Sequence, residues 1–491
     1  MRRASRSALA ALILLSVPCE AQGRADRSAE LKLTAVLKNI ASAYPKLLAL
    51  QQKEGAARAE LRSARGLWDP KLKLKGSSSQ LKGERLEYGL VELRQQTPLW
   101  GAELFAGYRL GLGAFPSYKE ELATLHSGEL RAGLELPLLA GRATDEGRAA
   151  ISKNAATREL ARWRSRLALI EVERSATEAY WDWVKASRLL AIQRELLTMA
   201  QGRAEGLKAQ VELGSKPPIT LVDNERLILE RSAEVISARR KLSESAYKLS
   251  LFFRDPELLT PITPTAEMAP PQLKRAWRPD LPPHQDDERQ LIERHPLLKA
   301  QRSAVQAAKV DLELAEALLG PRLNLSSFVA QDLIASVADE RSKLAKPELG
   351  VGLSFELPIG LNKASGKRAS AFAKQSAEEL KLRGLQDQLL MTLRQARVEL
   401  QADYEQALLA HKQVKVAYAL VQGERLKLQE GASDLILLNI RELAYAKAEA
   451  SEVKLIAAYH KAWATYLFSK GVLISASLKA HQSPSKKSVQ P

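Results

Sequence analysis

Tyr44-Pro45-Lys46-Leu47-Leu48 opens a segment that leads to Trp68-Asp69-Pro70-Lys71-Leu72, and His295-Pro296-Leu297-Leu298 opens one that leads to Leu319-Gly320-Pro321-Arg322-Leu323. In both segments the two prolines are 25 residues apart. A pattern that recurs in this way indicates that the chain contains one structural unit twice.

Three further landmarks recur in the same order. The strands expected in each half end at Glu135-Leu136-Pro137-Leu138 and at Glu356-Leu357-Pro358-Ile359. Long helical stretches then open at Gly147-Arg148-Ala149 and Gly366-Lys367-Arg368-Ala369, and they reach Gly214-Ser215 and Gly431-Ala432-Ser433. One matched pair could be chance, whereas five in order indicate a duplicated unit of helix, strands, long helix, turn and helix.

The helical stretches are unusually long. Residues 145–212 and 364–429 contain no proline, and each stretch would be about 100 Å long as a continuous helix. Laid end to end, residues 219–252 and 286–319 together have the length of one long helix. Residues 434–479 and 29–68 together are long enough to cover the other, with some fraying. These lengths predict antiparallel hairpins with one continuous and one interrupted arm, although several ordinary helical bundles would show the same periodicity.

The expected strands, at about 71–137 and 322–357, alternate between apolar and polar or small residues. In the last of them, Leu349, Val351, Leu353 and Phe355 alternate with glycine, serine and glutamate. A lipid-facing strand needs this alternation over about 9–11 residues, but a half-buried antiparallel strand shows it too.

The N-terminal residues favour the membrane interpretation of these strands. Arg2, Arg3 and Arg6 precede an apolar run over 8–17, which predicts a secretory signal peptide over 1–21. Pro18 makes Cys19 a poor site for lipid attachment. No other stretch approaches 18 consecutive apolar residues, so we expect that any membrane crossing uses strands.

Composition excludes several classes of function. The chain has 491 residues with a net charge of +17, 5% aromatic residues and one cysteine. The single cysteine argues against a disulfide scaffold or a thiolate metal site. The export signal and scarce aromatic residues argue against a nucleic-acid partner. No catalytic constellation, metal-ligand cluster or cofactor motif stands out, so we expect no enzyme activity and no cofactor.

The order of these features resembles the TolC-type outer-membrane efflux channel family over nearly the whole chain after the signal peptide. Besides the paired prolines, the resemblance rests on Ala179-Tyr180-Trp181-Asp182-Trp183 and on the turns that follow Gly214 and Gly431. It implies a mostly α-helical protein with a membrane β-barrel portion. Three copies would then form a trimeric α/β barrel channel-tunnel in the outer membrane of a Gram-negative bacterium, with a periplasmic extension.

The resemblance also implies a function. The homotrimer, surrounded by outer-membrane lipid, would be the passive exit duct of a tripartite efflux pump or a type I secretion system. A periplasmic adaptor protein and an inner-membrane pump would be its partners, and small molecules, metal ions or proteins its substrates. The alternative is a periplasmic structural or adaptor coiled-coil protein without a pore, which would need the helical hairpins but not the strands.

The two helix turns, at about 213–219 and 430–435, are the candidate periplasmic gate and adaptor-docking sites. Their candidate residues are Gly214, Ser215, Lys216, Thr220, Leu221, Asp223, Gly431, Ser433, Asp434 and Leu437. Leu221 and Leu437 stand where the family pattern places acidic residues. The constriction could therefore use Asp223 and Asp434 instead, or it could be apolar.

A second departure from the family concerns the strands. The family pattern has two strands per half, and the second half has room for two. The first half has room for four between Lys71 and Pro137, so residues 84–118 form either extra strands or a large external hairpin or loop.

The resulting domain plan has two repeats, 22–254 and 286–480, joined by a proline-rich segment over 255–285. That segment is either a disordered linker or, as we favour, an irregular stretch that wraps the helical tunnel. Residues 481–491 are expected to form a disordered tail. The acidic start of the second repeat, Asp286-Asp287-Glu288-Arg289, is expected to be a solvated helix start.

Overall fold

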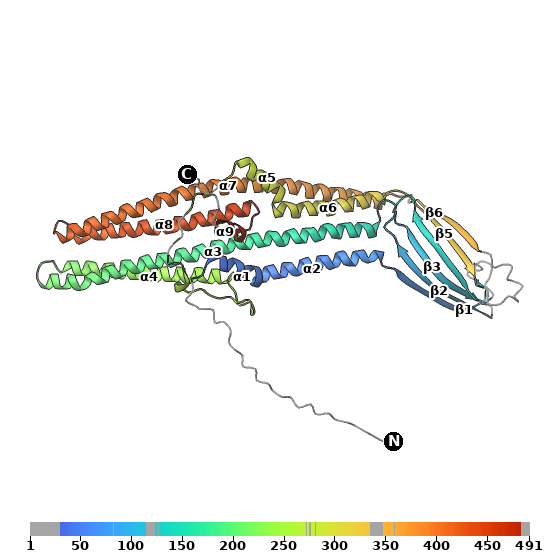
Figure 1. The fold of residues 1–491 in the computed structure, drawn as a ribbon, viewed down its shortest axis with the longest axis horizontal. Helices are drawn as coiled ribbons and strands as arrows, with labels where there is room; N and C mark the ends of the chain where they lie inside the picture. The colour runs from blue at the N-terminus through green and yellow to red at the C-terminus, as the bar shows by residue number, and fades with distance from the viewer. Residues whose placement is uncertain are drawn as a thin grey trace, which may run out of the picture.

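The chain is elongated, with long helices along most of its length and a β-sheet at one end (Figure 1). A computed structural model describes residues 30–81, 83–113, 123–125, 127–271, 273, 276–279, 281–333, 347–357 and 359–482. The expected signal peptide over 1–21, Cys19, Pro358 and residues 483–491 of the expected tail lie outside these ranges. Among the described residues, no helix is both long enough and apolar enough to cross a membrane.

The helices follow the duplicated order. Those before the proline-rich segment are α1 (Leu33–Ala43), α2 (Pro45–Arg65), α3 (Glu146–Glu212) and α4 (Ile219–Ser250). Those after it are α5 (His284–Arg294), α6 (Pro296–Ala317), α7 (Asn362–Gln429), α8 (Leu435–Ser469) and α9 (Ile474–Gln482). Helices α3 and α7 have 67 and 68 residues, which makes each about 100 Å long. Helix α9 ends two residues beyond the limit expected for the second repeat.

Each long helix is flanked by the short helices of its own repeat. Helix α3 packs against α4 toward the turn and against α2 toward the sheet, while α7 packs against α8 and α6 in the same way (Figure 1). Additional contacts of α3 with α6 and α8 join the two layers. The pairing expected from the segment lengths is therefore confirmed for 219–252 with 286–319, since α3 packs against both α4 and α6. It is wrong for 434–479 with 29–68, since α8 packs against α7 but α2 packs against α3. Length alone could not decide which short segment lies beside the second long helix, because 29–68 and 286–319 fill similar spans.

Local sequence sets where these helices begin. Pro45 and Pro296 occupy the first turns of α2 and α6, where a missing backbone N–H costs no helical hydrogen bond. Asp145 caps α3, because its carboxylate accepts a hydrogen bond of 2.8 Å from the backbone N–H of Arg148. The landmark prolines therefore mark breaks in the shorter arms, which lets the chain bend where α1 meets α2 and where α5 meets α6.

The hydrophobic core lies in the middle of the helical part, where the proline-rich segment crosses it. Trp183 is fully buried, and the Trp181 ring stacks on His460 of α8 with their centroids 3.8 Å apart. Tyr459 donates a hydrogen bond of 2.6 Å to the backbone carbonyl of Trp277 in the proline-rich segment. These aromatic contacts hold the described part of that segment against α3 and α8.

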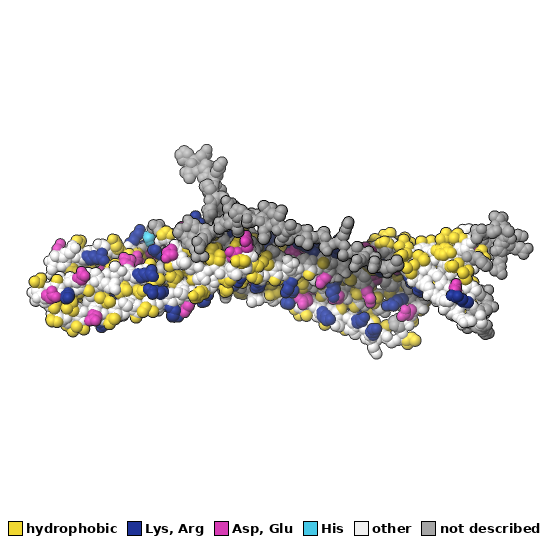
Figure 2. All heavy atoms as spheres, turned by 90° about the horizontal axis from the view of Figure 1, so that it is seen from below, with side chains coloured by type: hydrophobic (Ala, Val, Ile, Leu, Met, Phe, Trp, Pro, Cys, Tyr) yellow, Lys and Arg dark blue, Asp and Glu magenta, His cyan; other side chains and the backbone are white. Residues whose placement is uncertain are grey.

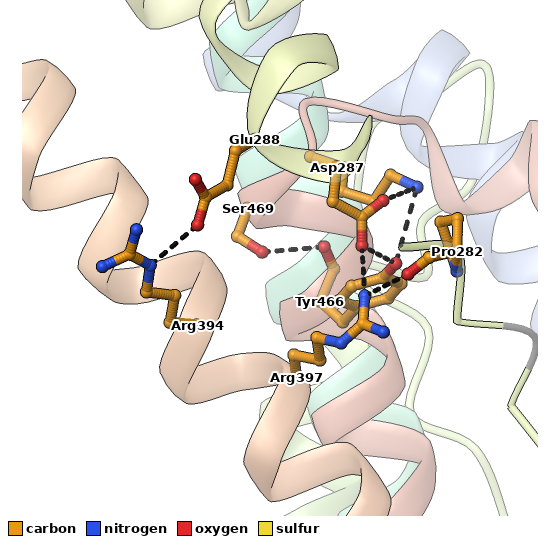
Figure 3. Close-up of polar contacts among 8 residues, drawn as sticks. Pro282, Asp287, Glu288, Arg394, Arg397, Tyr466 and Ser469 are labelled. Carbon is orange, nitrogen blue, oxygen red and sulfur yellow. Dashed lines mark hydrogen bonds and ion pairs between the residues drawn. The ribbon is translucent and has the colours of Figure 1, made fainter. Parts of the chain in front are cut away.

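A buried carboxylate lies at the start of the second repeat. Asp287, which is 1% exposed, accepts hydrogen bonds from Tyr466 at 2.6 Å and Arg397 at 3.0 Å, and it pairs with Lys470 at 2.7 Å (Figure 3). These partners come from α7 and from the end of α8. The expectation of a solvated helix start is therefore wrong for Asp287, although its neighbour Glu288 forms an exposed pair with Arg394.

His295, between α5 and α6, is buried as well. Its Nδ1 accepts a hydrogen bond of 3.2 Å from the backbone N–H of Leu297, and its Nε2 lies 3.3 Å from the carbonyl oxygen of Phe468. Burial lowers the pKa of this imidazole to about 4, because the charged form would lose its hydration. His295 is therefore neutral at pH 7 and caps α6 as a hydrogen-bond acceptor.

The described residues form a sheet of six antiparallel strands in sequential order, and this sheet is open in the single chain. The strands are β1 (Lys71–Leu81), β2 (Glu84–Gln96), β3 (Glu103–Leu112), β4 (Glu129–Pro137), β5 (Arg322–Asp332) and β6 (Glu348–Glu356). The described residues of 84–118 thus hold two strands, β2 and β3, which pair with β1 and β4 within the sheet and are not an external hairpin or loop.

Replacement of Asp287 with alanine should destabilise the protein strongly. Removing one partner of a buried pair costs about 3–5 kcal/mol, since Arg397 and Lys470 would be left without a counter-charge. Thermal unfolding in detergent measures the effect. The matched control is Glu288→Gln, one residue along, whose exposed pair should leave the melting temperature unchanged. Equal melting temperatures for the two variants would contradict this account.

Stability should fall as the pH is lowered from 6.5 toward 4, partly because of His295. In this range the unfolded chain binds a proton at this imidazole while the folded chain, with a pKa of about 4, does not. The resulting loss in the free energy of unfolding is small above pH 6.5 and reaches about 2 kcal/mol at pH 5. The variant His295→Asn keeps a capping oxygen but does not titrate. Its melting temperature should fall less than that of the wild type between pH 7 and pH 5.

Candidate functional site

The two helix turns at the end remote from the sheet have the same backbone geometry. Gly214 and Gly431 have φ values of +71° and +76°, a conformation that disfavours any residue with a Cβ. The N–H of Ser215 bonds to the carbonyl of Gln210, and that of Ala432 bonds to Lys427, at 3.0 and 2.8 Å. Both turns are therefore Schellman motifs, which close the ends of α3 and α7 and reverse the chain.

The residues after the glycines differ between the two turns. In the first, Pro217 and Pro218 lead into α4, and the Thr220 hydroxyl donates a hydrogen bond of 2.6 Å to the carbonyl of Pro217. In the second, Asp434 caps α8 by accepting a hydrogen bond of 2.7 Å from the N–H of Leu437. The first turn is stiffened by proline, whereas the second is held by a carboxylate.

The candidate gate residues lie on the surfaces of these turns. Asp223, Asp434 and Leu437 are exposed, and Leu221 is half-buried. Ser215 and Lys216 lie in the first turn, where the Ser215 hydroxyl bonds to the carbonyl of Gln210. Ser433 is directed back toward α7, where its hydroxyl bonds to Glu424. In the single chain the two turns are separate, so these residues form two surfaces rather than one site (Figure 1).

A charged cluster joins the two hairpins about 16 Å along the helices from the turns. Glu442 of α8 is 2% exposed, and its carboxylate pairs with Arg203 of α3 and with Arg425 of α7. Arg203 also bonds to the side chain of Asn439. We call these four residues the hairpin clamp. Because Arg203 belongs to the first hairpin and the other three to the second, the clamp fixes their relative position near the turns.

Polar side chains also fasten the first hairpin internally. Arg231 of α4 is buried and donates a hydrogen bond to the carbonyl of Leu196 in α3, and Asn224 bonds to the carbonyl of Ala200 at 3.2 Å. Burial lowers the pKa of the Arg231 guanidinium, and the nearby charge of Glu442 opposes this shift. The two helices of the first hairpin are thus joined by polar contacts as well as by apolar packing.

The residues of the hairpin clamp were not among the sequence candidates. Charged residues make up 27% of the chain, so an isolated arginine or glutamate on a long helix gives no signal of burial. Only the crossing of α3 against α8 brings Arg203 to Glu442, which is 239 residues away. Sequence reasoning found the turns because glycine and proline act locally.

The other candidate surface is the sheet, and one of its faces is apolar. Registered partners lie on the same face: Leu74 lies opposite Val91, which lies opposite Tyr108, and Val329 lies opposite Leu349. Leu349 and Val351 are 79% and 74% exposed. Figure 2 shows hydrophobic side chains gathered over one side of the sheet end. The face has the strand length and alternation that contact with lipid requires.

The opposite face of the sheet carries charges that are mostly paired. Arg94 contacts Glu92, Glu103 and Glu135, and Arg109 pairs with Glu129 at 2.5 Å. These residues come from three neighbouring strands.

Aromatic rings lie flat against this charged face. The Arg131 guanidinium is 5.5 Å from the ring centre of Phe105 and 4.8 Å from that of Phe328. The two rings cover Gly133 and Gly350 of the next strands, where a Cβ would collide with them. The charged face is therefore smooth and polar, as suits contact with water.

Comparisons with known proteins identify this arrangement of sheet and hairpins. No model of a known protein family matches the sequence, and no curated protein matches it. Solved structures do match. The CmeC outer membrane channel of Campylobacter jejuni has a TM-score of 0.62 and 11% identity, with 91% of this chain and 88% of that chain covered. The chain has the fold of outer-membrane channels.

Two further channels show the same fold. VceC, the outer membrane protein of Vibrio cholerae, has a TM-score of 0.62 and 15% identity, over 90% of this chain and 96% of that one. The MtrE outer membrane channel of Neisseria gonorrhoeae has a TM-score of 0.60 and 14% identity, over 90% of both chains. The resemblance inferred from the sequence landmarks is confirmed at the level of this channel fold. Within the described ranges, no three His, Cys, Asp or Glu side chains are grouped to hold a metal ion.

Loss of the Glu442 carboxylate should loosen the turns of this channel fold. Glu442→Gln leaves Arg203 and Arg425 without their counter-charge, and a loss of about 1.4 kcal/mol would raise local opening about tenfold. Hydrogen exchange of residues 200–224 and 431–445 measures this opening. The control Glu430→Gln, an exposed residue at the end of α7, should exchange like the wild type. An unchanged exchange rate in Glu442→Gln would contradict the role of the clamp.

Proposed function

We propose that this protein is an outer-membrane channel that assembles as a homotrimer and serves as the passive exit duct of a tripartite efflux pump or type I secretion system. Its sheet lies in the outer membrane and its helices extend into the periplasm of a Gram-negative bacterium. The observation that carries the proposal is the six-stranded sheet with one apolar and one charged face, joined to hairpins about 100 Å long.

Exposed apolar side chains along the helices support assembly into a trimer. On α4, Val222, Leu229 and Ile236 are 7 residues apart and exposed. On α7, Met391 and Val398 are exposed with the same spacing, and Leu409 and Val416 repeat it. Heptad spacing of this kind is the pattern of a coiled-coil seam. In the proposed trimer the stripe of α4 packs against that of α7 in the next copy.

The turns support a role in partner binding. The turns lie at the end farthest from the sheet (Figure 1). There Asp223 and Ile436 are exposed and Lys216 is half-buried. In the proposed duct this end faces the periplasmic adaptor and the inner-membrane pump. The six turns of a trimer would together form the entrance, which the hairpin clamps hold in place. The substrates would be small molecules, metal ions or proteins, and no covalent chemistry is involved.

The proposal predicts an outer-membrane trimer that resists mild heating in detergent. In mildly heated detergent samples from the outer-membrane fraction, the protein should migrate at about three times its chain mass of 54.1 kDa. The purified trimer should also give single-channel conductance in a planar lipid bilayer. Recovery only as a soluble periplasmic monomer would overturn the proposal and favour a coiled-coil protein without a pore.

A charge in the α4 stripe should prevent the assembly. Leu229→Lys places an ammonium group in the proposed seam, and leaving it buried and unpaired would cost several kcal/mol per copy. We expect loss of the trimer band and of conductance. Leu258→Lys is the matched control, because Leu258 is also largely exposed but lies in the proline-rich segment outside the stripe. A stable trimer of Leu229→Lys would exclude this seam.

A further inference from the structure

The turn between β2 and β3 holds a tryptophan in a backbone conformation that its side chain disfavours. The N–H of Ala102 bonds to the carbonyl of Leu99 at 2.9 Å, and Trp100 and Gly101 between them have φ values of +52° and +73°. Two positive φ values at these positions are typical of a type I′ turn, where Asn-Gly or Asp-Gly is usual. A bulky residue there is strained, and such strain is found mainly at functional positions.

The Trp100 side chain does not fill the core. It is 59% exposed, and its neighbour Leu99 is 71% exposed. The Arg142 guanidinium, from the loop between β4 and α3, lies 5.3 Å from the centre of the Trp100 ring. A cation at this distance over an indole ring is attracted to it. The turn therefore presents an apolar tip with a positive charge held beside it.

A hollow of about 820 Å³ lies beside this tip, between the turn, residues 138–143 and the link from α6 to β5. Leu138 lines the hollow, and it continues the alternation of the apolar face after Leu136. Residues of the charged face, among them Gln96 and Asn324, line a separate hollow. The hollow beside the tip therefore lies on the apolar side of the sheet.

The charges around this hollow are unequally paired. Arg148 of its wall pairs with Asp145 at 2.6 Å, and Glu316 pairs with Arg368 of α7 at 3.2 Å. Arg142 is exposed, and no carboxylate in the described part of the chain pairs with it. An unpaired cation beside exposed leucine and tryptophan side chains suits a ligand with an anionic head and apolar tails.

The position of the hollow along the sheet fits such a ligand. The turn lies at the end of the sheet next to the helices, because β2 returns from the far end to which β1 runs (Figure 1). In the proposed channel this end meets the boundary between the inner leaflet of the outer membrane and the periplasm. Tryptophan is enriched at such boundaries, where its ring contacts both acyl chains and headgroups.

We propose that the Trp100 turn and Arg142 bind an anionic phospholipid of the inner leaflet. The lipid phosphate contacts the Arg142 guanidinium, and the acyl chains lie against Leu99, Trp100 and Leu139, all of which are exposed. The proposal rests on the outer-membrane position proposed above and adds a lipid partner at a defined place. The strands β2 and β3, which exceed the two per half of the family pattern, would thus carry an anchor at the periplasmic boundary.

Fluorescence quenching by brominated lipid tests the site. The purified protein is reconstituted into vesicles of phosphatidylglycerol that carries bromine on the acyl carbons near the headgroup. Bromine quenches tryptophans that it contacts, so the wild type should be quenched and Trp100→Phe should lose part of that quenching. A second variant, Trp100→Asn, keeps the turn, because Asn accepts a positive φ. It should lose the same part.

Trp163→Phe is the matched control. The Trp163 ring also lies beside cations, with Lys299 at 4.4 Å and Arg162 at 5.6 Å from its centre. It belongs to α3, however, about 25 Å along the helix from its start at the sheet end. The quenching of Trp163→Phe should therefore equal that of the wild type.

A mixture of lipids tests the role of the charge. Vesicles contain phosphatidylglycerol and phosphatidylcholine in equal amounts, with bromine on one lipid or on the other. The quenching of Trp100, taken as the difference between proteins with and without this residue, then gives the relative binding of the two lipids. The wild type should prefer phosphatidylglycerol about fivefold, the contribution of one arginine near an anionic headgroup. Arg142→Gln should abolish the preference, whereas Arg240→Gln, an exposed arginine of α4, should keep it.

The outcomes separate this proposal from the proposed function. Quenching that Trp100→Phe leaves unchanged, in a protein that inserts as a trimer, would overturn the lipid site and leave the channel in place. A fivefold preference that survives Arg142→Gln would overturn the contact between Arg142 and the phosphate. An equal loss of quenching in Trp163→Phe would overturn the proposed position of the membrane, and failure of the wild type to enter vesicles would overturn both proposals.

Discussion

The structure depends on keeping two helices of about 100 Å covered along their length. No single return helix does this, since α3 and α7 are each flanked by two shorter helices from their own repeat. The breaks fall near the middle of the molecule, at Pro45 and Pro296 (Figure 1). Buried polar groups hold the second break together: Asp287 gathers donors from α7 and α8, and His295 caps α6. From these breaks the molecule extends toward the sheet on one side and toward the helix turns on the other.

Toward the sheet, the controlling feature is register. Because side chains alternate along a strand, a shift by one residue in any ladder would exchange the two faces. On one face Leu74 lies opposite Val91 and Leu325 opposite Leu353, while on the other face Lys73 lies opposite Glu92. The ion pairs around Arg94 and the rings beside Arg131 then occupy one face only. In the proposed channel, a sheet with one apolar and one charged face would separate lipid from water.

Toward the turns, the two repeats share a backbone but differ in side chains. Gly214 and Gly431 make the same Schellman geometry, while proline stiffens the first turn and Asp434 caps the helix after the second. The hairpin clamp joins the repeats through Arg203 and Glu442. The duplication therefore explains the shape of the chain, and the differences between the repeats give each turn its own surface. The extra strands of the first half are a further difference of this kind.

The sequence by itself determined the features that depend on neighbouring residues. Proline, glycine and the two-residue alternation act locally, so the paired breaks, the turns and the alternation of the strands could be predicted with their order. Tertiary structure decided the rest: which arm flanks which long helix, whether residues 84–118 pair as strands, and which charges are buried. Asp287 and Glu442 look like ordinary surface carboxylates in the sequence. Their burial depends on contacts between helices that are distant along the chain, and no local sequence pattern indicates those contacts.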